Sequence, residues 1–179
     1  MKRRKIEVSD HANDIVKALS KGVLLTTKAE KVNSMVIGWG TLGINWRKPV
    51  FAVYVREGRY TRAQLDKNPE FTVNVPVGEY DGRIIEVCGS RSGRNTDKVK
   101  EAGLTTVEAE SISVPAIKEF PLTLECRVMY IQKQDLSMLS EDINRRLYPK
   151  DVVEPTERAN RDAHITYYGE IINAYIIED

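Results

Sequence analysis

The spacing of short strand-like runs constrains the fold of this 179-residue chain more than any other feature of its sequence. Six runs are rich in apolar, β-branched and aromatic residues: 23–27, 34–39, 50–55, 71–75, 122–131 and 165–177. Four stretches have helical character: 9–22, 61–67, 81–87 and 97–102. Because these helices do not alternate regularly with the strands, we expect a mainly β fold with added helices. The pattern predicts an antiparallel Greek-key β-barrel and not a parallel βαβ sheet.

The last of these runs, residues 165–177, is apolar on both faces. Such a strand is covered on one side by its own barrel, and we expect a partner subunit on the other side, which favours a homodimer. Charged residues and helix formers crowd 140–148, and two prolines and a polar stretch follow. We interpret residues 135–163, approximately, as an insertion, a lid or a dimer arm within a single domain that spans residues 1–179.

Composition argues against several classes of function. The 27 Lys and Arg residues balance 26 Asp and Glu, so no net charge attracts nucleic acid over the whole surface. The one charge run, residues 2–5, is interpreted as a solvated arm, with a minor part in steering anionic nucleotides as the alternative. No apolar stretch reaches the roughly 18 residues of a membrane-spanning helix, and no signal peptide is recognised. With Cys88 and Cys126 as the two cysteines, we expect reduced thiols and a cytoplasmic location.

Residues 33–41 form the first of four segments whose polar residues and glycines suit a ligand. The glycines on either side of Trp39 would let backbone amides approach a flat ligand closely. Asn33, Ser34 and Thr41 offer side chains that form hydrogen bonds. A strand that ends in a turn, with Trp39 filling the core, explains the same residues equally well.

Residues 55–61 form the second segment, at an expected strand-to-helix junction. Arg56, Arg59 and the Thr61 hydroxyl stand together there, beside the free amides of a helix start. This combination suits an anion such as a phosphate monoester. Surface salt bridges with nearby carboxylates are the alternative explanation.

Residues 88–98 form the third segment, in which 89–93 is expected to be a loop. Its glycines, hydroxyls and cations suit a phosphate or a ribityl chain, although the spacing differs from that of a P-loop. Cys88 could be a reactive thiol near a helix end, but a buried and inert cysteine is the preferred interpretation.

Residues 164–171 form the fourth segment, at the head of the last strand. A single histidine such as His164 is more often structural than catalytic. His11 is the only other histidine, so no zinc-binding spacing is present and we expect no metal. A G-x-S-x-G motif is absent as well, which leaves a serine hydrolase poorly supported.

Taken in order, these four segments resemble the flavin reductase family with the FMN-binding split barrel, in particular its flavoredoxin-like branch. Residues 33–40 resemble its N-x-M-x-x-x-W-G signature and residues 55–61 its V-R-x-x-R-Y-T segment. Residues 88–98 resemble its C-G-x-x-S-G-R-x-x-D-K loop, and His164 with 168–170 resembles its closing motif. The resemblance spans nearly the whole chain.

The resemblance implies a split-barrel flavoprotein that binds FMN near a dimer interface. The residues that would line the flavin ring and the ribityl chain are Asn33, Ser34, Met35, Trp39, Gly40 and Thr41. The residues that would hold the ribityl and phosphate groups are Arg56, Tyr60, Thr61, Ser90, Ser92 and Lys98. The same motifs add as cofactor-binding residues Val55, Arg59, Cys88, Gly89 and Gly93. His164 is both a cofactor-binding residue and the candidate catalytic residue.

The resemblance also implies a reaction, because flavin itself carries out the redox chemistry. Hydride would pass from NADH or NADPH to the flavin, or electrons would pass between FMN and a small-molecule or protein partner. No nicotinamide-binding G-x-G-x-x-G motif is present, so the sequence does not establish the donor. Two alternatives stay open: a flavoredoxin-type electron carrier that oxidises little NADH or NADPH, and a small-barrel binding module without enzymatic activity.

Overall fold

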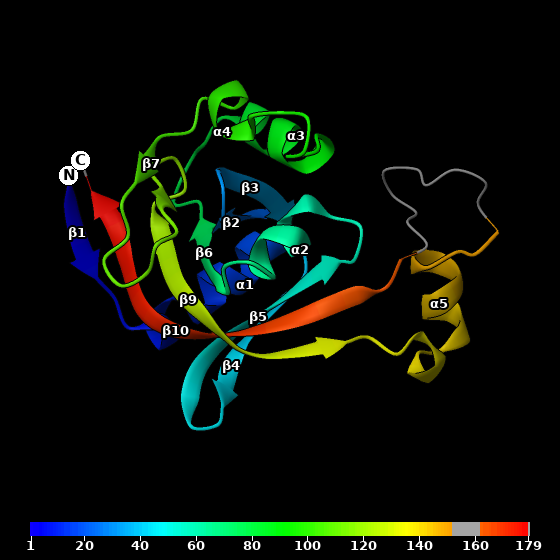
Figure 1. Ribbon diagram of the computed structural model, residues 1–179. Helices are drawn as coiled ribbons and strands as arrows, with labels where there is room; N and C mark the ends of the chain where they lie inside the picture. The colour runs from blue at the N-terminus through cyan, green and yellow to red at the C-terminus, as the bar shows by residue number, and fades with distance from the viewer. Residues whose placement is uncertain (152–161, 179) are drawn as a thin grey trace.

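The computed structural model describes residues 1–151 and 162–178, and a single antiparallel sheet forms its centre (Figure 1). Seven strands follow one another in the order β3-β2-β6-β9-β10-β5-β4, and β1 pairs with the far end of β10. The bounds of these strands are β1 Lys2–Lys5, β2 Val23–Lys28, β3 Val32–Ile37, β4 Gly40–Asn45, β5 Lys48–Arg56, β6 Glu70–Val75, β9 Leu122–Lys133 and β10 His164–Glu178. A separate two-stranded ribbon consists of β7 Thr106–Val107 and β8 Ala116–Ile117. The predicted mainly β, antiparallel barrel fold is confirmed.

The described residues also form five short α-helices around the sheet: α1 Ala12–Leu19, α2 Tyr60–Leu65, α3 Gly82–Ser90, α4 Lys98–Glu101 and α5 Glu141–Leu147. Figure 1 shows α3 and α4 together above β3, and α5 at the side of the molecule next to the start of β10. Two 3-10 turns, Val8–His11 and Leu136–Met138, precede α1 and α5. This arrangement brings the ends of β3, β5 and α3 to the same side of the barrel as the first residue of β10.

The barrel core contains the apolar residues that the alternation in the sequence predicted. In β6, Phe71, Val73 and Val75 are almost fully buried among side chains from β2, β5, β9 and β10. The other face of β6 is not solvent-exposed as alternation suggests, because Thr72 and Asn74 are also buried. Thr72 donates a hydrogen bond to the Pro115 carbonyl oxygen just before β8, and Asn74 accepts one from the Ile117 backbone N–H of β8, so these bonds attach the small ribbon to the barrel.

The N-terminal charge run corrects one expectation. Residues 2–5 are not a solvated arm but strand β1, which pairs with residues 175–178 of β10. Arg4 also forms an ion pair with Glu178, with a distance of 2.7 Å between Nε and Oε1. The charged side chains gave no strand signal because edge strands carry such residues without an apolar pattern.

Strand β10 departs from a regular ladder at Gly169, where the register against β9 shifts. A Cβ atom at Gly169 would lie 2.4 Å from the Phe71 ring, so only glycine fits this close approach. Much of β10 is already buried on both faces within one chain, including Tyr167 and Tyr175. Its apolar character therefore does not by itself require a partner, and the homodimer stays a prediction.

Two other boundaries differ from expectation. In place of the helix expected at 9–22, a 3-10 turn starts at Val8 and α1 itself runs only from Ala12 to Leu19. Helix α3 continues through Ser90, so the loop expected at 89–93 starts only at Arg91. Of the expected insertion at 135–163, residues 152–161 lie outside the described part of the chain.

Candidate functional site

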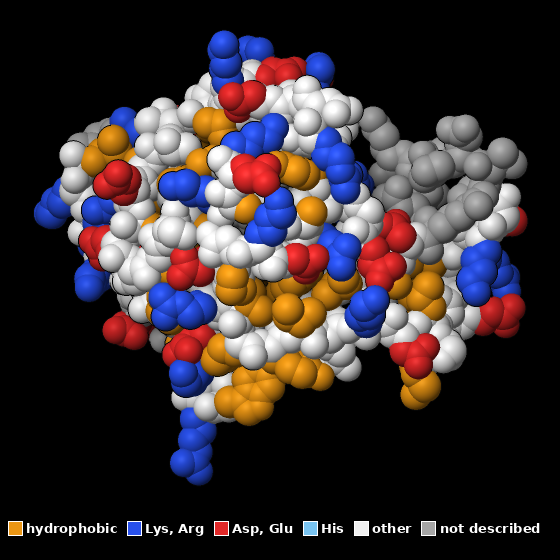
Figure 2. All heavy atoms as spheres, viewed as in Figure 1, with side chains coloured by type: hydrophobic (Ala, Val, Ile, Leu, Met, Phe, Trp, Pro, Cys, Tyr) orange, Lys and Arg blue, Asp and Glu red, His pale blue; other side chains and the backbone are white. Residues whose placement is uncertain are grey.

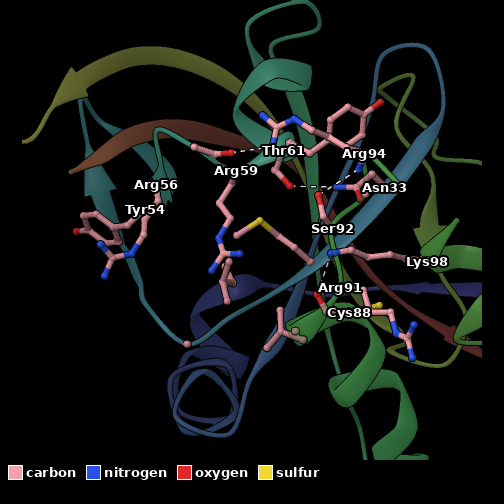
Figure 3. Close-up of a pocket in the computed structure, with 18 of the residues that line it drawn as sticks. Asn33, Tyr54, Arg56, Arg59, Thr61, Cys88, Arg91, Ser92, Arg94 and Lys98 are labelled. Atoms are coloured by element: carbon pink, nitrogen blue, oxygen red, sulfur yellow. Dashed lines mark hydrogen bonds between the residues drawn. The ribbon is translucent and has the colours of Figure 1, made fainter. Parts of the chain in front are cut away.

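A cavity of about 380 Å³ opens where β3, the β5–α2 turn, the end of α3 and the start of β10 meet (Figure 3). Its volume falls within the roughly 300–1,000 Å³ of small-molecule sites. The cavity is lined by Asn33, Met35, Val36, Ile37, Gly38, Trp39, Tyr54, Arg56, Gly58, Arg59, Tyr60, Thr61, Cys88, Gly89, Arg91, Ser92, Gly93, Arg94, Lys98 and His164. We call it the cationic cavity.

The lining of the cationic cavity is strongly one-sided in charge. It contains four arginines and Lys98, and no Asp or Glu side chain belongs to it among the residues that the structure describes. Two of these cations have acidic partners outside the lining: Arg56 lies 4.0 Å from Asp162, and Arg91 lies 3.0 Å from Glu101. The surplus of positive charge makes the cavity a site for an anion.

Lys98, the first residue of α4, is the most unusual of these cations because its side chain is buried. Its Nζ atom donates a hydrogen bond to the Cys88 carbonyl oxygen at 3.0 Å (Figure 3). The pKa of Lys98 is lowered from 10.5 to about 8, mainly by burial and to a smaller extent by the nearby Arg59 guanidinium group. A buried ammonium group with one neutral partner is short of negative charge, and an anionic ligand would supply it.

Arg59 stands at the turn between β5 and α2 and is exposed. Figure 3 shows its side chain extending into the same space as the end of Lys98. No ion pair or hydrogen bond of this guanidinium group is found within residues 1–151 and 162–178. As far as the described residues go, its five N–H donors are free to bind a ligand.

Asn33 and Gly93 form a tight contact at the far wall. Asn33 donates from Nδ2 to the Thr61 hydroxyl at 3.0 Å, while its Oδ1 atom is buried without a hydrogen-bond partner in the described structure. A Cβ atom at Gly93 would lie 2.0 Å from that oxygen and 2.7 Å from the Tyr60 ring. Glycine therefore lets the 91–94 loop pack closely against Asn33, whose Oδ1 atom has an unsatisfied capacity to accept a hydrogen bond.

His164 lies at the opposite end of the cavity, in a group of aromatic rings. The Trp39 ring centroid is 4.9 Å from that of His164, and the Tyr148 hydroxyl is 2.7 Å from His164 Nδ1. Burial, followed by the Arg56 charge, lowers the pKa of His164 from 6.5 to about 4. The imidazole is therefore neutral at pH 7 and can donate or accept a hydrogen bond without gaining charge.

Arg56 connects this end of the cavity to the 135–148 segment. It donates from Nη1 to the Asp162 carbonyl oxygen at 2.8 Å and from Nη2 to the Leu147 carbonyl oxygen at 3.0 Å. Its guanidinium group also stacks over the Tyr148 ring, 5.0 Å from the centroid. Arg56 thus has a structural task in addition to its positive charge, since it holds the end of α5 against the site.

Most of the residues predicted from the sequence line this one cavity. They are Asn33, Met35, Trp39, Arg56, Arg59, Tyr60, Thr61, Cys88, Gly89, Ser92, Gly93, Lys98 and His164. The four separate segments therefore come together in space, as we expected. Their role in binding a cofactor stays a prediction.

Five predicted residues lie away from the lining of the cavity. Ser34 is buried and shares a hydrogen bond with Thr26. Val55 belongs to the barrel core, and Thr41 shares a hydrogen bond with the Tyr54 hydroxyl on an exposed strand. Ser90 donates to the Glu86 carbonyl oxygen within α3. Gly40 is in close contact with Phe51, at the base of β4, and does not reach the cavity.

Several lining residues were not among the predicted cofactor-binding residues. These are Val36, Ile37, Gly38, Tyr54, Gly58, Arg91 and Arg94. Arg91 and Arg94 lie inside the third segment, and their charge was the available signal. Tyr148, which contacts His164, comes from a segment with no recognisable motif.

Cys88 lines the cavity, but it is buried, and burial raises the pKa of its thiol to about 11. This agrees with the preferred interpretation of an inert cysteine. No cluster of three or more His, Cys, Asp or Glu side chains able to hold a metal ion occurs in the described ranges. No helix within those ranges is both long and apolar enough to cross a membrane.

Comparisons with known proteins place this architecture among flavin-related domains. The family model described as "Flavin reductase like domain" matches residues 17–179. An uncharacterized protein of Archaeoglobus fulgidus is 32% identical over 106 residues, and the match covers 59% of this chain and 59% of that relative. This chain therefore matches less than two thirds of the relative's length.

Two solved structures with similar folds are flavoredoxins. The flavoredoxin of Desulfovibrio vulgaris (Miyazaki F) matches with a TM-score of 0.64 at 23% identity, over 88% of this chain and 69% of that chain. The flavoredoxin from Methanosarcina acetivorans matches with a TM-score of 0.61 at 28% identity, over 88% of this chain and 68% of that chain.

Proposed function

Because this chain belongs to the flavin reductase-like domain family, we propose that it is an FMN-binding flavoprotein oxidoreductase. The observation that carries the proposal is the cationic cavity, in which five cations and no described carboxylate surround a space of about 380 Å³. FMN combines a phosphate dianion with a flat ring, and the two ends of the cavity suit these two parts.

The residues of the cavity fit FMN in three respects. Lys98 is a buried ammonium group that lacks an anionic partner. The orphaned Oδ1 atom of Asn33 is an acceptor for a ribityl hydroxyl or a ring N–H. Trp39 and Met35 provide apolar surface near the neutral His164, against which a ring can pack.

These positions suggest which side chains would bind the phosphate and which would position other residues. Lys98 and Arg59 would hold the phosphate, and each charge-assisted hydrogen bond contributes roughly 1.5–3 kcal/mol. Arg56 would act mainly by positioning α5 and Tyr148, because its guanidinium group is already bonded to two carbonyl oxygens. FMN, once bound, would supply the redox chemistry by accepting and releasing a hydride or electrons.

A spectrum tests the proposal. Purified protein is incubated with excess FMN and desalted, and we expect a yellow protein with about one flavin per chain. An Arg59→Ala/Lys98→Ala double variant should lose most of the flavin, while an Arg62→Ala/Lys100→Ala variant should keep it, because neither Arg62 nor Lys100 lines the cavity. Folded protein that stays colourless would refute FMN binding and favour a binding module without enzymatic activity.

The source of the electrons is the finer part of the proposal. We propose NADH or NADPH as the donor, and the alternative is an electron carrier of the flavoredoxin type, which the two matched flavoredoxin structures favour. Anaerobic mixing of the FMN-loaded protein with NADH or NADPH separates them. Bleaching of the flavin absorbance within seconds would support a reductase, and bleaching only with a reducing protein partner would support a carrier.

We also propose a homodimer, now on different grounds. Trp46 of the β4–β5 turn, Tyr130 of β9 and Tyr168 of β10 form a cluster of rings, with centroid distances of 5.5–6.0 Å, on an exposed face. Figure 2 shows hydrophobic side chains gathered over this part of the molecule. Exposed aromatic patches of this kind often mark interfaces. A cytoplasmic location stays a proposal as well.

A further inference from the structure

A second pocket of about 480 Å³ adjoins the cationic cavity on the other side of Trp39 and His164. It is lined by Val16, Leu19, Ser20, Gly38, Trp39, Gly40, Tyr54, Gln134, Tyr148 and His164. The two spaces share four of these residues: Gly38, Trp39, Tyr54 and His164. We call the second one the neutral pocket.

The charge of the neutral pocket contrasts with that of its neighbour. No Lys, Arg, Asp or Glu lines it in the part of the chain that the structure describes. A ligand charge placed there would lose water without gaining an ionic partner, which is costly. The pocket therefore selects an uncharged ligand, whereas the cationic cavity selects an anion.

The aromatic and aliphatic residues that line the neutral pocket favour a planar ring. Trp39 is 42% exposed, although a tryptophan in a barrel of this size is usually buried, and its ring forms part of the wall. Leu19 and Val16 of α1 lie on the same wall. Aromatic and aliphatic surfaces in this arrangement bind a flat molecule by stacking and burial.

The proton on His164 follows from its contact with Tyr148. Tyr148 is 3% exposed, and its hydroxyl has no hydrogen-bond partner other than His164 Nδ1 among the described residues. If Nδ1 carried the proton, the tyrosine hydrogen would be buried without an acceptor, which is unfavourable. The hydroxyl therefore donates to Nδ1, and the neutral imidazole carries its proton on Nε2.

Gln134 adds a second donor to the neutral pocket. Its side-chain oxygen accepts the His164 backbone N–H at 3.2 Å. This contact leaves the Gln134 amide N–H groups without a protein partner within the described ranges. Two residues with donors that lack a protein partner, His164 and Gln134, thus line a pocket whose described residues carry no charge.

We propose that the neutral pocket binds an uncharged planar carbonyl compound, whose oxygen accepts a hydrogen bond from His164 Nε2, and that Tyr148 is the positioning residue that fixes this tautomer. The compound would be the second reactant of the FMN enzyme, and that role rests on the proposed function. The binding site itself does not depend on FMN, because its lining includes none of the five cations.

Three probes of equal size test the chemistry. Acetophenone is a neutral planar ketone, α-methylstyrene has the same shape without the oxygen, and benzoate is an anion. Binding is followed by Trp39 fluorescence in a Trp46→Phe protein, since Trp39 and Trp46 are the two tryptophans. We expect acetophenone to bind about fivefold more tightly than α-methylstyrene, the factor that one neutral hydrogen bond of about 1 kcal/mol gives.

Two variants test whether His164 causes this fivefold preference. A His164→Phe change should abolish the preference for acetophenone over α-methylstyrene, and His11→Phe, at the histidine on the 3-10 turn before α1, should preserve it. Inorganic phosphate should displace benzoate but leave acetophenone bound. Equal binding of the two neutral probes by the parent protein, or displacement of acetophenone by phosphate, would overturn the proposal.

A ¹⁵N spectrum of labelled histidine tests the role of Tyr148 directly. The His164 signals should show the Nε2–H form in the parent protein and a mixture of tautomers in a folded Tyr148→Phe variant. A Tyr130→Phe variant is the control, because Tyr130 is exposed on β9 and lies outside the pocket. An Nδ1–H form in the parent protein, or no change in Tyr148→Phe, would overturn the assignment.

Saturating FMN separates this proposal from the proposed function. Acetophenone should still bind to FMN-loaded protein, and competition between the two would overturn the proposal because the neutral pocket would then belong to the flavin site. Binding that weakens as the protein concentration rises would also overturn it, since a second copy of the chain would then cover the pocket. Retention of FMN without acetophenone binding refutes this proposal alone, and the reverse result refutes only the FMN proposal.

Discussion

The buried Lys98 predicts a pH dependence of FMN binding that has a definite sign. Burial lowers the pKa of Lys98 in the free protein to about 8. A bound phosphate would favour the charged ammonium group and return the pKa toward its ordinary 10.5. Lys98 must therefore be protonated to bind tightly, and the protein takes up a proton on binding at pH values above about 8.

The size of the effect follows from the same numbers. At pH 7 the ammonium form dominates, and one charge-assisted hydrogen bond of about 1.5–3 kcal/mol corresponds to roughly a 10- to 100-fold effect on Kd. A Lys98→Met variant should lose this factor at pH 7. Between pH 8 and pH 9 the Kd of the parent protein should rise by about fivefold, because the protonated fraction of Lys98 falls by about that factor.

Fluorescence titration with FMN and with riboflavin at pH 7, 8 and 9 measures this. Riboflavin lacks the phosphate, so its Kd should respond little to Lys98→Met or to pH. Lys100→Met, on the same helix but outside the cavity, is the control and should behave like the parent protein. An equal loss of riboflavin and FMN affinity in Lys98→Met, or the same pH dependence with and without Lys98, would refute this placement of the phosphate.

Three further predictions concern individual residues. The pKa of His164 is lowered from 6.5 to about 4, so between these pH values the unfolded chain binds a proton that the native state does not. The free energy of unfolding should therefore fall by about 3 kcal/mol from pH 6.5 to pH 4, relative to a His164→Asn variant. Urea titrations that show the same acid sensitivity in both proteins would contradict this. Gly93→Ala should destabilise the protein by about 1–3 kcal/mol and reduce FMN retention after desalting, because the added Cβ would clash with Asn33. At the control position Gly43 an added Cβ meets no atom within 4 Å, so Gly43→Ala should retain FMN normally. Cys88 should react with iodoacetamide at about pH 7.5 far more slowly than free cysteine, since its pKa is raised to about 11; mass spectrometry that finds rapid alkylation would contradict the buried-thiol interpretation.

The strands that form the barrel core could be predicted from the sequence because their apolar residues alternate. This holds for β6, where Phe71, Val73 and Val75 face the core. Strand β4 could not be predicted, because residues 40–45 contain two glycines and are mostly exposed at the edge of the sheet. The charged β1 gave no signal for the same reason. Strand β1 depends on pairing with β10, which is distant in the sequence, whereas β4 pairs with β5, which follows it directly.

The sequence predicts those residues of the candidate site that belong to recognisable motifs. Arg59 and Lys98 stand in recognisable segments, and the fold brings them together. Ser34 does not line the cavity, because a strand points successive side chains to opposite faces and the Ser34 hydroxyl bonds to β2 instead. No sequence motif marks Tyr148, because its place in the site depends on a contact with His164 that only the folded structure shows.

The most direct test of the account is a crystal structure of the protein with bound FMN. The account predicts that the phosphate lies within hydrogen-bonding distance of Lys98 Nζ and the Arg59 guanidinium group, with the flavin ring toward Trp39 in the cationic cavity. A flavin bound elsewhere, or one whose phosphate contacts neither Lys98 nor Arg59, would contradict it.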